Sequence, residues 1–150
     1  MVQAVQEKLN LHIEDLPNRI QTISEEKLNQ KPAPNKWSKK EILGHLIDSG
    51  TYNLQRFKEA QFAEQPYLVR KYDQDNLVMV NHYQDQSLNE ILSYWVFINR
   101  QIIKTISKIS PDKLKHPVTT DGKEIAGNLA WLIEDYLIHM EHHFRQIFGD

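Results

Sequence analysis

Apolar side chains recur along most of this chain at intervals of three or four residues, which places them on one face of an α-helix. No long stretch alternates apolar and polar positions as a half-buried strand does, and glycine is scarce, with 5 in 150 residues. The pattern therefore predicts four long helices. They occupy roughly 3–23, 38–62 and 87–110, and a last stretch that runs from the turn at 119–122 to Ile147 and includes Ile125.

Polar residues at the predicted helix starts support these boundaries. Ser38 is followed three residues later by Glu41, and Ser87 by Glu90. In such a capping box, the serine hydroxyl accepts a hydrogen bond from the glutamate N–H, and the glutamate side chain accepts one from the serine N–H. The first helix contains Pro17, where we expect a kink or a break because proline lacks the N–H that a helix interior uses.

The connections between the helices differ in length. Residues 24–36 form a turn-rich link, whereas 63–86 is long for a loop and is rich in aliphatic and aromatic side chains. A long packed crossover allows helices 2 and 3 to run parallel, while the shorter links leave other neighbours antiparallel. The expected fold is all-α: a four-helix bundle with a long crossover between helices 2 and 3, in a single domain over 1–150.

Composition excludes several classes of protein. A net charge of −2 and a pI near 6.4 provide no basic surface for nucleic acid. No apolar run reaches the roughly 18–20 residues that span a bilayer, and the first residues lack the pattern of a signal peptide, so we expect no membrane association and a cytoplasmic location. The sequence contains no cysteine, which excludes disulfides, thiolate metal ligands and a thiol nucleophile from the chain itself.

The segment HMEHH, residues 139–143, places three histidines near the end of the last predicted helix. It is not the H-E-x-x-H motif of zinc proteases, because Glu141 lies about 200° around the helix from His139 and cannot serve as the base. His139 and His143, four residues apart, share a face and can hold one ion. His139 with His142, three residues apart, is an alternative pair.

A third histidine, His45, lies two turns into the second predicted helix among apolar residues. If the second and fourth helices are antiparallel, His45 faces His139 and His143, and three imidazoles form a site with open positions. Gly44 suggests that another group approaches the helix closely here. The rival di-iron site of bundle proteins requires Glu-x-x-His, which this sequence lacks, so we expect one metal ion.

Other candidates carry weaker signals. Asp48 and Asp135 lie one turn from His45 and His139 and could accept the second ring N–H of these histidines, or could simply be solvated. The histidines expected to have only surface or capping roles are His12, His82 and His116. The remaining candidates are Tyr52 as a pocket residue, Arg56 in a surface ion pair, and Trp95 and Trp131 in the core or a dimer interface.

Two segments resemble the DinB-like superfamily, which includes damage-inducible proteins and bacillithiol transferases. These are KPAPNKWSKKEILGHLIDSGTYNLQRF at 31–57 and LAWLIEDYLIHMEHHFRQI at 129–147. The resemblance implies an up-down-down-up bundle, often a homodimer, with a histidine triad that binds a divalent metal such as zinc or nickel. The family's ligand positions fall on His45, His139 and His143, which leaves His142 as an extra histidine.

The resemblance also implies an activity. Characterised relatives are thiol-dependent transferases and isomerases that use bacillithiol, mycothiol or glutathione. A chain without cysteine would have to import its thiol, and a divalent metal would deprotonate that thiol. The expected function is transfer of a low-molecular-weight thiol to an electrophile. The alternatives are a non-catalytic metal-binding stress-response dimer and a metal-dependent hydrolase.

Overall fold

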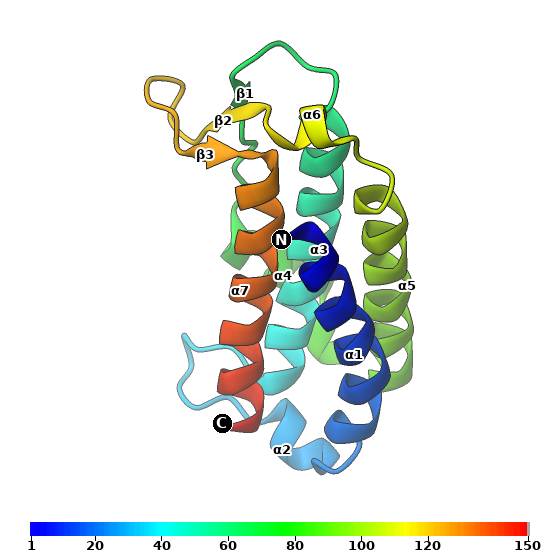
Figure 1. The fold of residues 1–150 in the computed structure, drawn as a ribbon. Coiled ribbons are helices and arrows are strands. Elements are labelled where there is room, and N and C mark those ends of the chain that lie inside the picture. The colour runs from blue at the N-terminus through cyan, green and yellow to red at the C-terminus, as the bar shows by residue number, and fades with distance from the viewer. Residues whose placement is uncertain (150) are drawn as a thin grey trace.

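Four long helices form the body of the molecule in the computed structural model, which describes residues 1–149 (Figure 1). They are α1 (Val2–Ile20), α3 (Lys39–Glu59), α5 (Leu88–Ile106) and α7 (Leu129–Phe148). Helices α3 and α5 run parallel, and α1 and α7 run in the opposite direction (Figure 1). The predicted four-helix bundle with up-down-down-up topology is confirmed.

The helix starts follow the capping residues. Ser38 forms both halves of its capping box: its N–H donates to Glu41 at 2.8 Å, and its hydroxyl accepts from the Glu41 N–H at 3.1 Å. At Ser87 only one half forms, because the Glu90 carboxylate accepts from the Ser87 hydroxyl rather than from its backbone. The second predicted capping box is therefore incomplete, although α5 still begins after Ser87.

Some predicted boundaries were wrong. Of the kink or break expected at Pro17, the break does not occur: α1 continues through it, and Leu16 and Ile20 on either side are buried in the core. It ends at Ile20, and α2 (Glu25–Asn29), capped by Ser24, occupies part of the predicted turn-rich link. Helix α5 ends at Ile106, about one turn earlier than predicted, although tight backbone turns continue to residue 109.

The last helix also starts later than predicted, at Leu129. The preceding residues form a hairpin between β2 (Pro117–Thr119) and β3 (Gly127–Asn128). The Asp121 carboxylate holds its turn by accepting from the N–H groups of residues 123 and 124. Ile125 therefore lies in an exposed loop, and the Asn128 side chain caps α7. Sequence periodicity did not reveal these short strands.

The crossover between α3 and α5 is ordered, as predicted. It contains β1 (Tyr67–Leu68), α4 (Gln74–Asn81) and a single 3₁₀ turn, η1 (Tyr83–Asp85). Strand β1 pairs in parallel with β2, which makes a three-stranded sheet at one end of the bundle beside α6 (Pro111–Leu114) (Figure 1). The crossover thus returns the chain to the other end of the bundle, where α5 starts.

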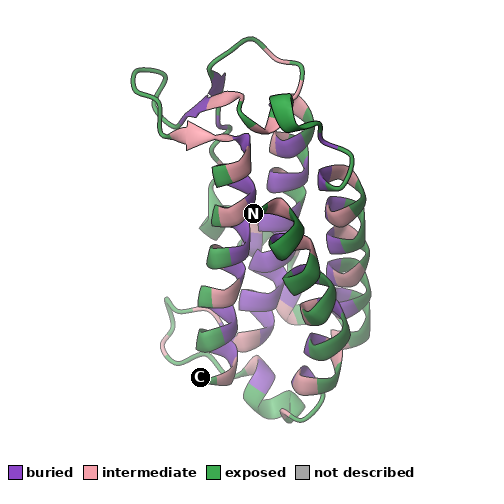
Figure 2. Ribbon diagram, viewed as in Figure 1, coloured by how far each residue is buried: buried purple, intermediate pink, exposed green. Residues whose placement is uncertain are grey.

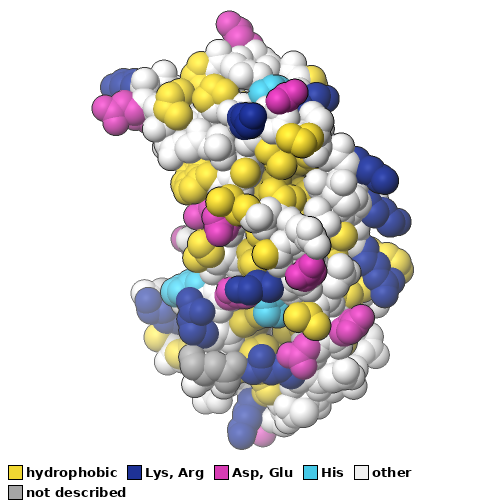
Figure 3. Space-filling model, viewed as in Figure 1, with side chains coloured by type: hydrophobic (Ala, Val, Ile, Leu, Met, Phe, Trp, Pro, Cys, Tyr) yellow, Lys and Arg dark blue, Asp and Glu magenta, His cyan; other side chains and the backbone are white. Residues whose placement is uncertain are grey.

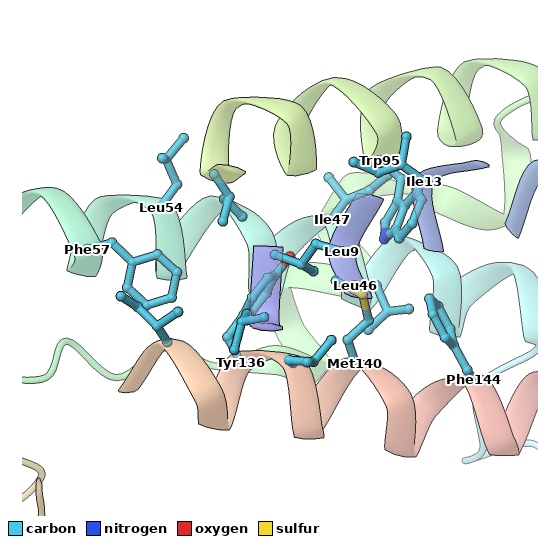
Figure 4. Packing of buried hydrophobic residues seen from close by; sticks show 14 of the residues in the cluster. Leu9, Ile13, Leu46, Ile47, Leu54, Phe57, Trp95, Tyr136, Met140 and Phe144 are labelled. Carbon is cyan, nitrogen blue, oxygen red and sulfur yellow. The ribbon is translucent and has the colours of Figure 1, made fainter. Parts of the chain in front are cut away.

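Helix α3 is the most enclosed element, with most of its residues buried (Figure 2). It packs against α5, α7, α4 and α2. Around it Trp95, Tyr136, Met140 and Phe144 interlock with residues of α1 and α3 to form the core (Figure 4). Because α3 lies in the middle, polar side chains on it are removed from water, and this position creates the site described below.

The ring of Tyr83 lies directly on Gly44. A Cβ atom at position 44 would lie 2.2 Å from a Tyr83 ring carbon, so only glycine allows this contact. The close approach suggested by Gly44 is therefore real, and the group that approaches is the tyrosine of η1.

The surface is mixed in character. On the face shown in Figure 3, acidic and basic side chains are interspersed, with hydrophobic side chains between them. Within residues 1–149 no helix has the length and apolarity that a membrane crossing requires.

Candidate metal centre

Three histidines from two helices meet inside the bundle. The Nε2 atom of His139 lies 3.3 Å from His45 Nε2 and 3.1 Å from His143 Nε2. One nitrogen from each of the three rings falls within 4.8 Å of the others. The antiparallel packing of α3 and α7 thus brings together the three residues singled out from the sequence.

The triad is sheltered from solvent. His45 is fully buried and His143 nearly so, while His139 is half-buried. Burial, reinforced by the neighbouring histidines, lowers the pKa of His45 to about 3 and that of His139 to about 4. Burial also lowers the pKa of His143. All three imidazoles are therefore neutral at pH 7, with lone pairs available for a cation.

The outer ring nitrogens have different partners. His143 Nδ1 lies 2.8 Å from Gln146 Oε1, so Nδ1 carries the hydrogen and Nε2 keeps its lone pair toward the centre. His139 Nδ1 lies 3.4 Å from the Ser49 hydroxyl. His45 Nδ1 is buried and has no hydrogen-bond partner among the described residues.

The arrangement fits a divalent metal ion. Two imidazole nitrogens bound to one zinc ion at tetrahedral angles lie roughly 3.3 Å apart. The Nε2 separations at His139 match this spacing. Without a cation, the neighbouring Nε2 atoms would have to share hydrogens to avoid repulsion between their lone pairs. The contact with Gln146 places the hydrogen of His143 on Nδ1, so its Nε2 has no hydrogen to share. The three side chains could therefore hold one ion.

Aromatic side chains cover the triad. The Trp37 ring lies 4.7 Å from the His45 ring, centroid to centroid, just before α3 begins. Tyr72, from the segment between β1 and α4, lies 6.5 Å from the same ring and stacks on Tyr52 at 4.5 Å. Trp37 and Tyr72 are half-buried, so they lie between His45 and solvent, and Tyr52, also half-buried, supports Tyr72.

The two aspartates considered as partners of the histidine rings do not contact them. Asp48 Oδ1 accepts hydrogen bonds from the Tyr83 hydroxyl at 2.6 Å and from Asn81 Nδ2 at 2.9 Å. Asp135 is exposed on α7, and no hydrogen bond joins it to His139. One helical turn from a histidine was too coarse a criterion, because a short aspartate side chain at that spacing can point to a different neighbour.

Arg56 differs from its prediction as well. It forms no ion pair with another described residue: Nε donates to the Arg70 carbonyl at 3.1 Å, Nη2 donates to the same oxygen, and Nη1 donates to Asn53 Oδ1 at 3.3 Å. Of the two tryptophans, Trp95 is fully buried in the core, whereas Trp131 is partly exposed. Trp131 packs over Gly127, where a Cβ would meet its ring at 2.6 Å.

The remaining histidines lie outside the triad. His12 Nε2 lies 3.1 Å from Glu141 Oε1, and His116 Nδ1 lies 2.9 Å from the Ala60 carbonyl. His82 ends α4 in the left-handed conformation, with φ of 51°. His142 is exposed and contacts Gln146, so its ring does not face His45.

Comparison with known proteins places the chain in a family. The sequence matches the model of the DinB superfamily over residues 8–147. The chain belongs to the DinB superfamily. No curated protein matches the sequence. Among solved structures, YfiT from Bacillus subtilis is similar, with a TM-score of 0.86 and 18% identity over 99% of this chain and 84% of that one. YfiT is described as a probable metal-dependent hydrolase with an unusual four-helix bundle topology.

Ser49 and Tyr72 were not recognised from the sequence, and Arg56 was given another role. Ser49, Asn53 and Arg56 follow His45 at helical spacing, and this row of polar residues on an otherwise buried helix was a usable signal. Tyr72 had no such signal, because it lies in the irregular part of the crossover. Its position over the triad depends on the tertiary path of that segment.

Proposed function

We propose that His45, His139 and His143 hold one divalent metal ion and that the protein uses it to activate a nucleophile. The observation that supports this proposal is the convergence of three neutral imidazole nitrogens from two rigid helices. Zinc and nickel are the favoured ions, because imidazole suits both.

The proposed reaction is transfer of a low-molecular-weight thiol, of the bacillithiol or glutathione type, to an electrophile. A bound divalent ion lowers the pKa of a thiol or water molecule that coordinates it. The chain has no cysteine, so the thiol would come from a small molecule. Three histidines leave part of the coordination sphere open for it.

Within residues 1–149 no carboxylate contacts the triad, which favours a thiol over water as the nucleophile. Asp48 is engaged by Tyr83 and Asn81, and Asp135 points to solvent, so neither contacts the triad to act as a base. A thiol, with a pKa near 8.5, needs a much smaller shift than water, with a pKa of about 15.7, to ionise at neutral pH. The chain would contribute the hydroxyl of Ser49, which lies against His139 and can hold that ring in place.

A metal-dependent hydrolase is the second candidate. It is favoured by the description of YfiT, which has the same fold, as a probable enzyme of this kind. The same three histidines would hold the metal, and a water molecule would replace the thiol. A third reading, a metal-binding stress-response protein without catalysis, requires only the triad.

Conjugation assays distinguish these functions. Metal-stripped and reconstituted protein would be mixed with monochlorobimane and either glutathione or bacillithiol, and in parallel with an activated ester. Thiol transfer predicts metal-dependent conjugation that is lost in His143→Ala and kept in His142→Ala, with circular dichroism unchanged in both. Metal-dependent ester cleavage without conjugation would favour the hydrolase. Neither activity in the metal-loaded protein would favour the non-catalytic reading.

Metal binding is tested separately. His45→Ala should lower the affinity for zinc or nickel by more than about 100-fold, because two ligands on one helix hold an ion poorly. Unchanged stoichiometry and affinity in His45→Ala would exclude the three-ligand site.

We also propose that the protein is a homodimer, as the family resemblance implies. Large apolar side chains are exposed on α5 and α7, including Phe97 and Ile138, and burial of such groups would stabilise a dimer. Sedimentation of a single monomeric species at micromolar concentration would contradict this.

A further inference from the structure

A stripe of polar side chains leads away from the triad along α3. Ser49, Asn53 and Arg56 follow His45 at intervals of four, four and three residues, which places them on one face. Ser49 and Asn53 are buried, and Asn53 Nδ2 donates to the Ser49 carbonyl at 2.9 Å. The stripe ends at the guanidinium of Arg56, which is half-buried.

The Arg56 guanidinium is held in position by neutral acceptors. It donates to the Arg70 carbonyl through Nε and Nη2 and to Asn53 Oδ1 through Nη1. These bonds use three of its five N–H groups. Within residues 1–149 no carboxylate lies within 4 Å of this guanidinium, although Asp135 acts on its charge from farther away. A fixed, partly desolvated cation with free donors and no ion-pair partner is suited to bind an anion.

The side chain of Tyr72 lies close to both the guanidinium and the triad. The ring of Tyr72 lies 5.4 Å from Arg56 Cζ and 6.5 Å from the His45 ring centroid, so one side chain spans the interval between them. A small molecule lying along Tyr72 could therefore contact both groups.

We propose that Arg56 binds a carboxylate of the substrate whose reacting end reaches the histidine triad. The inference rests on the proposed function and narrows its substrate class to small acids. The carboxylate would accept from the two free N–H groups of Arg56, and the nucleophile or the electrophile at the other end would lie at the metal. The alternative role of Arg56 is purely structural: it would only tie the Arg70 carbonyl to α3.

Binding of thiols to the cobalt-substituted protein tests the proposal without turnover. The probes are ω-mercaptocarboxylic acids of increasing length, each paired with its methyl ester, and the signal is the thiolate-to-cobalt absorption band. We expect an acid of matching length to bind about tenfold more tightly than its ester, since charge-assisted bonds to arginine are strong. The acid and its ester should bind equally when the chain is too short to reach Arg56.

Variants distinguish carboxylate binding by Arg56 from a purely structural role of this residue. Arg56→Gln should abolish the preference for the acid, and Arg56→Lys should retain part of it, because lysine keeps the charge but loses the planar fork. Arg70→Gln is the matched control: it removes a charge from the same segment, but its side chain pairs with Glu59, so the preference should remain. The cobalt spectrum without thiol must be unchanged in each variant.

The two proposals fail in different ways. Equal affinity of acids and esters at every length in the wild-type protein, or a preference that survives in Arg56→Gln, would overturn the role of Arg56 alone. Absence of a thiolate band with any thiol would overturn thiol activation at the triad, and this inference with it. If Arg56→Gln does not fold, the acid–ester comparison in the wild-type protein and in Arg56→Lys decides the question.

Discussion

His45 and Asp48 lie one turn apart on α3, and both are buried, but the groups around them differ. Asp48 accepts short hydrogen bonds from Tyr83 and Asn81, side chains that the crossover brings to it. His45 instead faces two other histidines, whose ring nitrogens converge with its own. The fold supplies donors to one oxygen of Asp48, although Oδ2 has no partner among the described residues, whereas His45 belongs to a set of like groups that an external cation would complete.

This difference teaches how to distinguish a structural polar residue from a functional one. Both have shifted pKa values: burial raises that of Asp48 to about 6 and lowers that of His45 to about 3. A shifted pKa alone therefore does not identify the site. The convergence of three ring nitrogens does, because one cation from outside the chain can satisfy all three together.

His45, His139 and His143 form the triad, and Asp48, Tyr83 and Asn81 form a second group that we call the Asp48 cluster. Metal binding should produce the largest difference in stability between variants of these two clusters. An ion that binds only the folded protein, at a free concentration 1,000-fold above its Kd, stabilises it by about 4 kcal/mol, or roughly 10 °C in Tm. Calorimetry with and without a chelator should show this shift in the wild-type protein and in Asp48→Asn. It should disappear in His139→Ala. An Asp48→Asn protein that no longer responds to metal would show that the two clusters are one site.

Gly44→Ala should have the next largest effect and should act on the Asp48 cluster. The new Cβ would overlap the Tyr83 ring, which would have to move off Asp48, at a cost of about 2–3 kcal/mol in the free energy of unfolding. Gly50→Ala is the control, because its Cβ would meet Ile98 at 3.2 Å, a contact that small shifts can relieve. Urea titration of both variants measures the difference, and equal losses would contradict this account.

The main features of this fold were predictable because they depend on local rules. Helical periodicity placed the four long helices, and the Ser38 capping box marked the start of α3 correctly. The late start of α7 was not predictable, since the β2–β3 hairpin depends on a partner strand, β1, about fifty residues earlier. Periodicity describes one segment at a time and carries no information about such pairings.

In the site, too, the features set by local sequence were predictable and those set by tertiary contacts were not. An argument from helix direction could bring His45 to the histidines of α7, because rigid helices transmit position over several turns, and the family resemblance selected His143 over His142. The groups that surround them could not be placed in this way. Asp48 was considered as a partner of His45 or as a solvated carboxylate, but it binds Tyr83, and Tyr72 was overlooked, since both contacts depend on how the crossover folds back over α3.

The two clusters should also respond oppositely to acid in the metal-free protein. The folded-state pKa of His45 is depressed, so the folded protein is not penalised for keeping this ring neutral above about pH 6.5. Its stability falls as the pH drops from there toward about 3, because the unfolded chain takes up the proton first. The folded-state pKa of Asp48 is raised, so its ionisation destabilises the protein above about pH 6, and this penalty disappears as the pH falls toward 3.8. Acidification from pH 7 to 5 therefore lowers the stability that neutral His45 contributes and reduces the destabilisation that ionised Asp48 causes.

Two variants isolate these contributions in urea titrations at pH 7 and 5. The stability of Asp48→Asn relative to wild type should fall by about 1–2 kcal/mol between pH 7 and pH 5, because the wild-type protein is relieved of its buried charge. The stability of His45→Gln relative to wild type should rise over the same interval. Changes of the same sign in both variants would contradict the assigned pKa directions.

The smallest expected effect concerns the groups that orient the triad. Gln146 fixes the His143 tautomer through a 2.8 Å contact with Nδ1, but it is exposed, so water can replace part of its role. Loss of such a partner typically lowers metal affinity by about 10–100-fold, and we expect Gln146→Ala to fall at the lower limit of that range. His142→Ala, which removes only the other partner of Gln146, should change the affinity by less than about twofold. Competition titrations with a chromophoric chelator measure both values. A larger loss in His142→Ala than in Gln146→Ala would mean that His142 is itself a ligand, and that α7 presents its histidines at the three-residue spacing rather than at the four-residue spacing.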